Sequence, residues 1–291
     1  MAQRTSSLWI RVSPINSSES QSNRRWAAIQ VDAGASVQEN LSTAKELIQE
    51  AAESGCSLAA LPEFFIVRGS QETIRQNALT LNSDPIVELT RLAREHSVNV
   101  LAGSVPIQDP DREGYCYNRS LLIDQSGEIT AQYNKIHLFD VDIGDELTVQ
   151  ESDVLSGGDS IVDSSVDGVK VGLTICYDLR FPELYRELSD RGVRVIFVPS
   201  NFTRETGRAH WEPLLRARAI ENQCYIVAPN QIGKNRETDV ASLGQSMIVD
   251  PWGQVIARCS DTEGWISGTL DTSYQRRIRR ELPSLDHREL S

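Results

Sequence analysis

The sequence lacks the local motifs by which metal sites, disulfide-stabilised domains and serine nucleophiles are usually recognised. No two cysteines form a CxxC pair, and no two histidines form an HxxxH or HExxH pair. A GxSxG segment is also missing. The cysteines are odd in number and widely spaced, at Cys56, Cys116, Cys176, Cys224 and Cys259. We therefore expect no metal site, and free thiols in a reducing compartment.

Long apolar runs and an excess of positive charge are absent as well. No stretch approaches the ~18 consecutive apolar residues that a membrane span requires. The chain has 41 acidic and 29 basic residues and a formal net charge of −12, which disfavours nucleic acid or an anionic membrane as the main partner. The hydrophobic fraction of 40% is typical of a globular protein with a large core. We expect a cytoplasmic protein.

Residues 1–25 differ in composition from the rest of the chain. They contain seven serines and four arginines but a single acidic residue, Glu19. This composition is typical of a targeting segment, although a disordered or mis-started extension is the interpretation we favour. No repeat, Gly/Ser linker or composition break follows residue 26. We therefore expect residues 26–291 to form a single domain.

Residues 168–188, GVKVGLTICYDLRFPELYREL, change from a strand pattern to a helix pattern. Apolar side chains first alternate with a period of two, from Val169 to Ile175. They then recur at helical spacing after Pro182, which suits a first helical turn. Cys176 therefore lies where a strand ends and a helix is about to begin, and the free amides of a helix start favour a thiolate. A buried, inert cysteine is the alternative.

Strand and helix patterns alternate through the middle of the chain, whereas hairpins are predicted near both ends. Helices are expected after the capping box that begins at Ser36, after Asp84, after Pro182 and over residues 209–222. The pattern predicts an α/β protein of two packed sheets with outer helices. Periodicity alone leaves open a single doubly wound sheet.

Three of the predicted strands end in a reactive side chain: Glu63 after LAALP, Lys135 in YNKIH and Cys176 in LTICYD. Each one alone is more simply a solvated acid, a surface lysine or a core cysteine. Together they suit acyl transfer, because a thiol needs a base and a lysine stabilises the oxyanion that follows. The alternative of a serine or metal hydrolase has no motif to support it.

These segments resemble the nitrilase, or carbon–nitrogen hydrolase, superfamily. The Glu–Lys–Cys triad of that family is similar to LPEFF (61–65), YNKIHLFD (133–140) and GLTICYDLRFPEL (172–184). The resemblance covers residues 26–287 and implies a four-layer αββα sandwich of the nitrilase type that needs no cofactor. It also implies a homodimer or homotetramer, with the helix after Cys176 and the 209–222 helix at the interface between subunits.

The resemblance further implies roles for five residues. Cys176 would be the nucleophile and Glu63 the general base and acid. Lys135 and the backbone amide of Tyr177 would stabilise the oxyanion. Glu151, in the long acidic loop after the lysine, would help to hold Lys135 and the attacking water. The partner would be a small-molecule amide, cleaved through a thioester.

The segment that begins at the nucleophile, CYDLRFPEL, resembles the short-chain amidases of the superfamily rather than its nitrile- or carbamoyl-hydrolysing members. Residues 199–228 and 246–260 are similar to the same branch. This resemblance implies hydrolysis of deaminated glutathione to 2-oxoglutarate and cysteinylglycine. The alternatives are an omega-amidase that acts on α-ketoglutaramate, and a catalytically inactive interaction protein with this fold.

A substrate with two carboxylates calls for cationic or donor groups at the mouth of the pocket. The candidates are Arg180, Phe202, Thr203, Arg204 and Arg208, and two further cations that lie near predicted strand ends are Arg119 and Lys234. Arg204 and Arg208 are the best candidates, because the strand before them is expected to neighbour the Cys176 strand.

Overall fold

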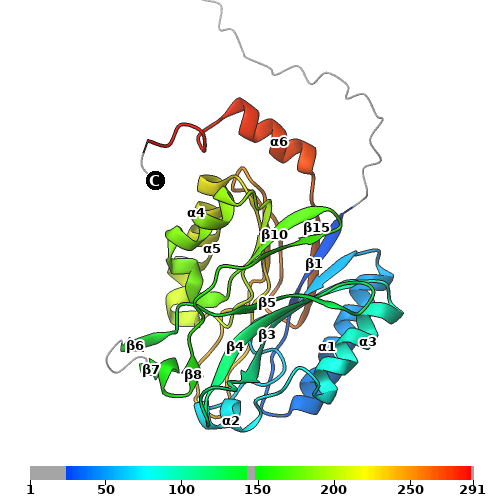
Figure 1. Ribbon diagram of the computed structural model, residues 1–291, viewed down its shortest axis with the longest axis vertical. Coiled ribbons are helices and arrows are strands. Elements are labelled where there is room, and N and C mark those ends of the chain that lie inside the picture. Colours follow the sequence, from blue (N-terminus) through cyan, green and yellow to red (C-terminus); the bar gives the residue numbers. More distant parts are fainter. Residues whose placement is uncertain (1–23, 143–147, 290–291) are drawn as a thin grey trace, which may run out of the picture.

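The computed structural model describes residues 24–142 and 148–289 (Figure 1). The extension expected for residues 1–25 lies outside this range except at its very end, where the first strand, β1 (Arg25–Gln30), begins. Of the helices in the described ranges, none combines the length and the apolar character that crossing a membrane requires.

The described strands form two main sheets. The first has seven strands in the order β15-β1-β2-β3-β4-β5, with β8 paired to β4. Its centre is parallel, from β1 through β2 to β3, and its flanking strands are antiparallel. The bounds beyond β1 are β2 (Leu58–Ala60), β3 (Asn99–Gln108), β4 (Cys116–Ile123), β5 (Ile129–Asn134), β8 (Leu155–Ser156) and β15 (Gly264–Thr269).

The second sheet has six strands in the order β14-β13-β12-β11-β10-β9. Again the central strands β10, β11 and β12 are parallel, and antiparallel strands complete both edges. The bounds are β9 (Asp163–Val166), β10 (Val169–Leu173), β11 (Val195–Phe197), β12 (Tyr225–Ala228), β13 (Met247–Val249) and β14 (Val255–Arg258). A separate small hairpin joins β6 (Asp140–Asp142) to β7 (Thr148–Gln150).

Helices cover the outer face of each sheet, which confirms the predicted αββα sandwich (Figure 1). The first sheet carries α1 (Val37–Glu53) and α3 (Asp84–Glu95), and the second carries α4 (Pro182–Asp190) and α5 (Arg204–Asn222). The remaining helices are α2 (Gln71–Gln76) at one end of the sandwich and α6 (Thr272–Glu281) near the C-terminus.

The period of two along β1 explains how the layers stack. Trp26 and Ala28 belong to the core between the sheets, whereas Ala27 and Ile29 pack in the core beneath α1 and α3. The indole of Trp26 stacks on Phe197 of the facing sheet, with ring centroids 5.6 Å apart. Because both faces of this strand are covered, its residues are almost continuously apolar.

Two boundaries differ from those expected. The helix expected over 209–222 begins earlier, at Arg204, and therefore includes Gly207. This glycine packs closely on Leu243, because a Cβ at Gly207 would lie 2.8 Å from that side chain. Glycine therefore serves close packing here and does not break the helix. Lys135 lies just after β5 rather than within it.

Candidate active site

Cys176 occupies a strained turn beyond the end of β10. The strand stops at Leu173, and a 3₁₀ turn, η2 (Cys176–Arg180), begins at the cysteine itself. The φ of Cys176 is 45°, in the left-handed region that residues other than glycine rarely adopt. The amide of Cys176 donates to the carbonyl of Pro199 at 2.9 Å. The residue is 9% exposed and lines a cavity.

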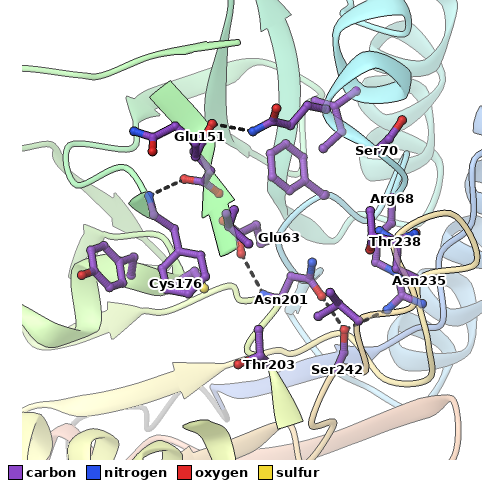
Figure 2. A pocket seen from close by; sticks show the side chains of 18 of the residues that line it. Glu63, Arg68, Ser70, Glu151, Cys176, Asn201, Thr203, Asn235, Thr238 and Ser242 are labelled. Atoms are coloured by element: carbon purple, nitrogen blue, oxygen red, sulfur yellow. Dashed lines mark hydrogen bonds between the residues drawn. The ribbon is translucent and has the colours of Figure 1, made fainter. Parts of the chain in front are cut away.

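Glu63 is held by three donors in the turn after β2. Its Oε1 accepts from Nδ2 of Asn118 at 2.8 Å and from Nζ of Lys135 at 3.0 Å. Its Oε2 accepts from the backbone amide of Asn201 at 2.8 Å. The side chain is buried, with 2% of the residue exposed. These donors fix the carboxylate next to Cys176 (Figure 2).

Lys135 lies between two carboxylates, that of buried Glu63 and that of half-buried Glu151. Its ammonium donates to Glu63 and, at 2.9 and 3.1 Å, to both oxygens of Glu151. The backbone amide of Phe139 also donates to Glu151, at 2.7 Å. Burial disfavours the charge on Lys135, but Glu151 and then Glu63 outweigh it, so that the pKa of Lys135 lies well above its usual value. The lysine is therefore a fixed positive charge.

The surroundings of Cys176 favour the protonated form of its thiol. Burial, followed by the negative charge of Glu63, raises the pKa of Cys176 well above its usual value, and Lys135 offsets only part of this rise. The expectation that a helix start would favour the thiolate is thus wrong for the resting protein. The neighbouring element is a short 3₁₀ turn, and α4 begins only at Pro182.

Glu63, Lys135 and Cys176 meet in the wall of a cavity of about 840 Å³. Glu151 and the residue after the cysteine, Tyr177, line it too. Beyond Asn201 the cavity has a second part that lies farther from Cys176, here called the distal part (Figure 2). The residues of that distal part are Arg68, Ser70, Asn235, Thr238 and Ser242. The structure therefore brings together all five residues for which the resemblance implied a catalytic role.

The structure separates the proposed substrate-binding residues into two groups. Arg180, Phe202 and Thr203 line the cavity. Arg204 and Arg208, the best candidates from the sequence, do not line it and are exposed on α5. Their strand does neighbour β10, but the chain turns at Thr203 to start α5, and this turn directs the next residues away from the site.

Two other cations near strand ends also lie outside the cavity walls. Arg119 donates to the side-chain oxygens of Asn134 and Gln132 on β5. Lys234 pairs with Asp239 across the base of its own loop. Both positive charges are therefore engaged elsewhere.

Arg180 is the cation in this wall that has no carboxylate partner within the described residues. Its guanidinium lies over the rings of Tyr177 and Phe202, 5.8 and 5.4 Å from their centroids. It also lies 3.3 Å from Nδ1 of His210. An unpaired guanidinium against two rings is oriented and available for an anionic ligand.

Asp178 is a site residue that no sequence pattern indicated. Its carboxylate is fully buried, and Oδ1 accepts from the amide of His137 at 3.1 Å and lies 2.7 Å from the Nδ1 of that residue. Oδ2 accepts from the hydroxyl of Tyr133 at 2.7 Å and from the amide of Ile175 at 2.8 Å. Asp178 thus ties the segment that carries Lys135 to the turn that carries the nucleophile.

Asn118 and Asn201 are two further site residues that no sequence pattern indicated. Each touches Glu63 from a segment far away in the sequence, and an isolated asparagine carries no local signal. Within residues 24–142 and 148–289, no group of three or more His, Cys, Asp or Glu side chains gathers as a metal site.

Comparison with known proteins identifies the family of this chain. The chain belongs to the carbon–nitrogen hydrolase family, whose model matches residues 25–280. It is 42% identical over 267 residues to a mouse protein named deaminated glutathione amidase, covering 90% of this chain and 82% of that protein. A Synechocystis protein of the same name is 39% identical over 264 residues, covering 90% and 97%.

The fold comparison gives the same family. The crystal structure of the NitFhit protein of C. elegans matches with a TM-score of 0.87 and 36% identity. The match covers 92% of this chain but 65% of that longer one, which is named as a fusion of a nitrilase and a fragile histidine triad protein.

Proposed function

We propose that this protein is an amidase that hydrolyses deaminated glutathione to 2-oxoglutarate and cysteinylglycine. The observation that carries the proposal is the buried cluster of Glu63, Lys135 and Cys176 in a cavity of about 840 Å³. Similarity to relatives named for this activity, at 42% and 39% identity, supports the choice of substrate. A cavity of this size is in the usual range for a ligand larger than a simple amide.

The first half of the reaction forms a thioester. Glu63 takes the proton from Cys176, and the sulfur attacks the amide carbonyl carbon. Lys135 and the backbone amide of Tyr177 stabilise the negative charge on the carbonyl oxygen. Glu63 then gives its proton to the leaving nitrogen as the carbon–nitrogen bond breaks.

The second half releases the acid. Glu63 removes a proton from a water molecule, whose oxygen attacks the thioester carbonyl carbon. When the carbon–sulfur bond breaks, Glu63 returns this proton to the sulfur, which restores the thiol of Cys176. Glu151 keeps Lys135 charged and positioned throughout. No step requires a metal ion or a redox cofactor.

We further propose that Arg180 binds the carboxylate next to the keto group of the substrate. It is the cation in the wall that no described carboxylate neutralises, and Phe202 and Thr203 complete that side of the cavity. A guanidinium can bind a carboxylate through two parallel hydrogen bonds.

Four substrates test the proposal in one comparison: deaminated glutathione, α-ketoglutaramate, a simple nitrile and a carbamoyl amino acid. We expect the highest kcat/KM for deaminated glutathione. Faster turnover of α-ketoglutaramate would make the protein an omega-amidase, and no turnover of any of the four would favour an inactive interaction protein. A preference for the nitrile or the carbamoyl compound would reject both amidase assignments.

We also propose that the protein forms a homodimer through α5, or a tetramer built from such dimers. Ile220 on α5 is 49% exposed, and Trp252 in the β13–β14 turn is 53% exposed. The two are neighbours, because Ile220 packs against Gly253. Exposed large apolar side chains that adjoin one another are typical of an interface.

Light scattering tests the dimer. We expect a mass of at least twice the 32.4 kDa of one chain. The variant Ile220→Glu is expected to shift the protein toward the monomer. Val87→Glu on α3, at a residue that is 50% exposed, is the matched control and leaves the mass unchanged. A purely monomeric wild type would contradict the proposal.

A cytoplasmic location is also part of our proposal. All five cysteines are unpaired and buried in the structure. Free thiols in this number suit a reducing compartment.

A further inference from the structure

The side-chain amide of Asn201 is held in one orientation by a chain of hydrogen bonds. Buried Arg68 pairs with Asp32 and donates from Nη1 to Oγ of Ser242 at 3.0 Å. Oγ of Ser242 lies 2.6 Å from Oδ1 of Asn201. Arginine can only donate, so the serine accepts from it and has its own proton free for the asparagine oxygen. With the Asn201 amide turned over, its NH₂ group could not accept this proton, so the observed orientation is the one that satisfies the Ser242 hydroxyl.

This orientation leaves the Nδ2 of Asn201 as a free donor. Among the hydrogen bonds of the described residues, none uses this nitrogen, and Figure 2 shows it pointing away from Ser242 into the open part of the cavity. A donor in a cavity wall that is held in one orientation and lacks a protein partner is suited to a ligand. A pre-oriented amide also loses little conformational entropy when a ligand binds.

The position of Asn201 indicates which part of the substrate it meets. Its backbone amide bonds Oε2 of Glu63, and Glu63 is the residue that protonates the leaving nitrogen in the proposed reaction. Asn201 lies between Glu63, to which its backbone amide donates, and Ser242, which donates to its side-chain oxygen (Figure 2). Ser242 lines the distal part of the cavity together with Arg68, Ser70, Asn235 and Thr238. The free donor therefore lies where the leaving group departs, on the side of Glu63 that opens into this distal part.

We propose that Asn201 and this distal part form a binding site for the leaving group, in which Nδ2 of Asn201 donates to a carbonyl or carboxylate oxygen of a peptide-like amine. The inference rests on the proposed function and deepens it. Cysteinylglycine carries such oxygens, whereas the ammonia released from a primary amide carries none. Asn201 would therefore determine specificity for amides with a dipeptide leaving group.

The test compares two substrates with the same acyl group, deaminated glutathione and α-ketoglutaramate. The variant Asn201→Ala is expected to lower kcat/KM for deaminated glutathione about tenfold or more, mainly through KM, as for the loss of one hydrogen bond to a charged or carbonyl oxygen. Turnover of α-ketoglutaramate is expected to stay within about twofold of the wild type, since it offers no acceptor at this point. The inhibition constant of cysteinylglycine should rise in parallel with the first effect.

Two further variants separate a binding role from a structural one. Ser242→Ala frees the Asn201 amide to rotate, so it should reproduce part of the same substrate-selective loss. The double variant should be no worse than Asn201→Ala alone, because both substitutions remove one interaction. Arg204→Ala, at an exposed residue outside the cavity, is the control and leaves both substrates unaffected.

Three results would overturn the inference. An equal loss of kcat/KM on both substrates would show that Asn201 acts on the reacting atoms or on folding stability. An unchanged kcat/KM together with an unchanged inhibition constant would show that Asn201 does not contact the leaving group. If the wild type cleaves α-ketoglutaramate but not deaminated glutathione, the proposed function fails together with the inference. A failure of the proposed function can be distinguished from a failure of the inference alone, because the first is seen in the wild-type protein before any substitution is made. If Asn201→Ala does not fold, the inference is tested by the substrate selectivity of Ser242→Ala and by the inhibition constant of cysteinylglycine for that variant.

Discussion

Tyr133 donates its hydroxyl hydrogen to Oδ2 of Asp178 at 2.7 Å, and this bond joins the end of β5 to the turn of the nucleophile. The same carboxylate oxygen accepts the amide of Ile175, the residue before Cys176. Lys135 lies two positions after Tyr133. One buried carboxylate therefore fixes the distance between two segments that are far apart in the sequence.

We expect Asp178→Asn to lower both stability and kcat. Its partners include two backbone amides, which can only donate, so an asparagine NH₂ would face donors instead of accepting from them. Leaving a buried group unsatisfied costs about 1–3 kcal/mol. Urea unfolding measures the first effect, and kcat well below the melting temperature measures the second.

The control for this prediction is Asp261→Asn at an exposed position, which should change neither quantity. An Asp178→Asn protein of reduced stability but unchanged kcat would show that Asp178 supports the fold without positioning the site.

The variant Cys176→Ala should abolish amide hydrolysis and leave the fold intact. It removes the sulfur that forms the thioester. Cys176→Ser should also lose nearly all activity, since a carboxylate deprotonates a hydroxyl far less readily than a thiol. Mass spectrometry of the wild type stopped during turnover should show the acyl adduct on this residue.

Cys259→Ala is the matched control, because Cys259 is also buried but lies outside the cavity. It should retain wild-type activity. Wild-type turnover in pure Cys176→Ala would reject the covalent mechanism.

The variant Glu63→Gln should lose activity although its thiol ionises more readily. After burial, the charge of Glu63 is the main cause that raises the pKa of Cys176. Removing this negative charge favours the thiolate, so the midpoint of the thiolate titration should move to lower pH. Ultraviolet absorbance of the thiolate measures it, with Cys176→Ala as the baseline for the other cysteines. A midpoint that stays the same or rises would contradict the assigned cause.

The variant Arg180→Ala should weaken binding of the α-keto carboxylate. The loss of one charge-assisted contact is expected to cost about 1.5–3 kcal/mol in kcat/KM. The same acyl group occurs in deaminated glutathione and α-ketoglutaramate, so both substrates should suffer alike, in contrast to the Asn201 variants. Arg208→Ala is the matched control, and an equal loss in that variant would return the carboxylate site to α5.

The sequence by itself determined which segments form strands and helices, and its resemblance to a family predicted the four layers and the cluster of Glu63, Lys135 and Cys176. Periodicity shows which face of a segment is buried, and it placed β10, α1 and α3 correctly. Glu63, Lys135 and Cys176 were selected because each follows a recognisable strand within a family motif. Their strands belong to two different sheets, β2 and β5 to the first and β10 to the second, and the packing of the sheets brings the strand ends together.

Only the tertiary structure decided which polar groups face the cavity. Periodicity carries no information on the direction of a turn, so it could not separate Arg180 in the cavity wall from Arg204 on the exposed face of α5. Periodicity also could not predict the direction in which the pKa of Cys176 shifts, because a pKa depends on burial and on charges that other segments supply. The contacts of Asp178 and Asn201 join residues that are distant along the chain, and only the packing of the two sheets sets those distances.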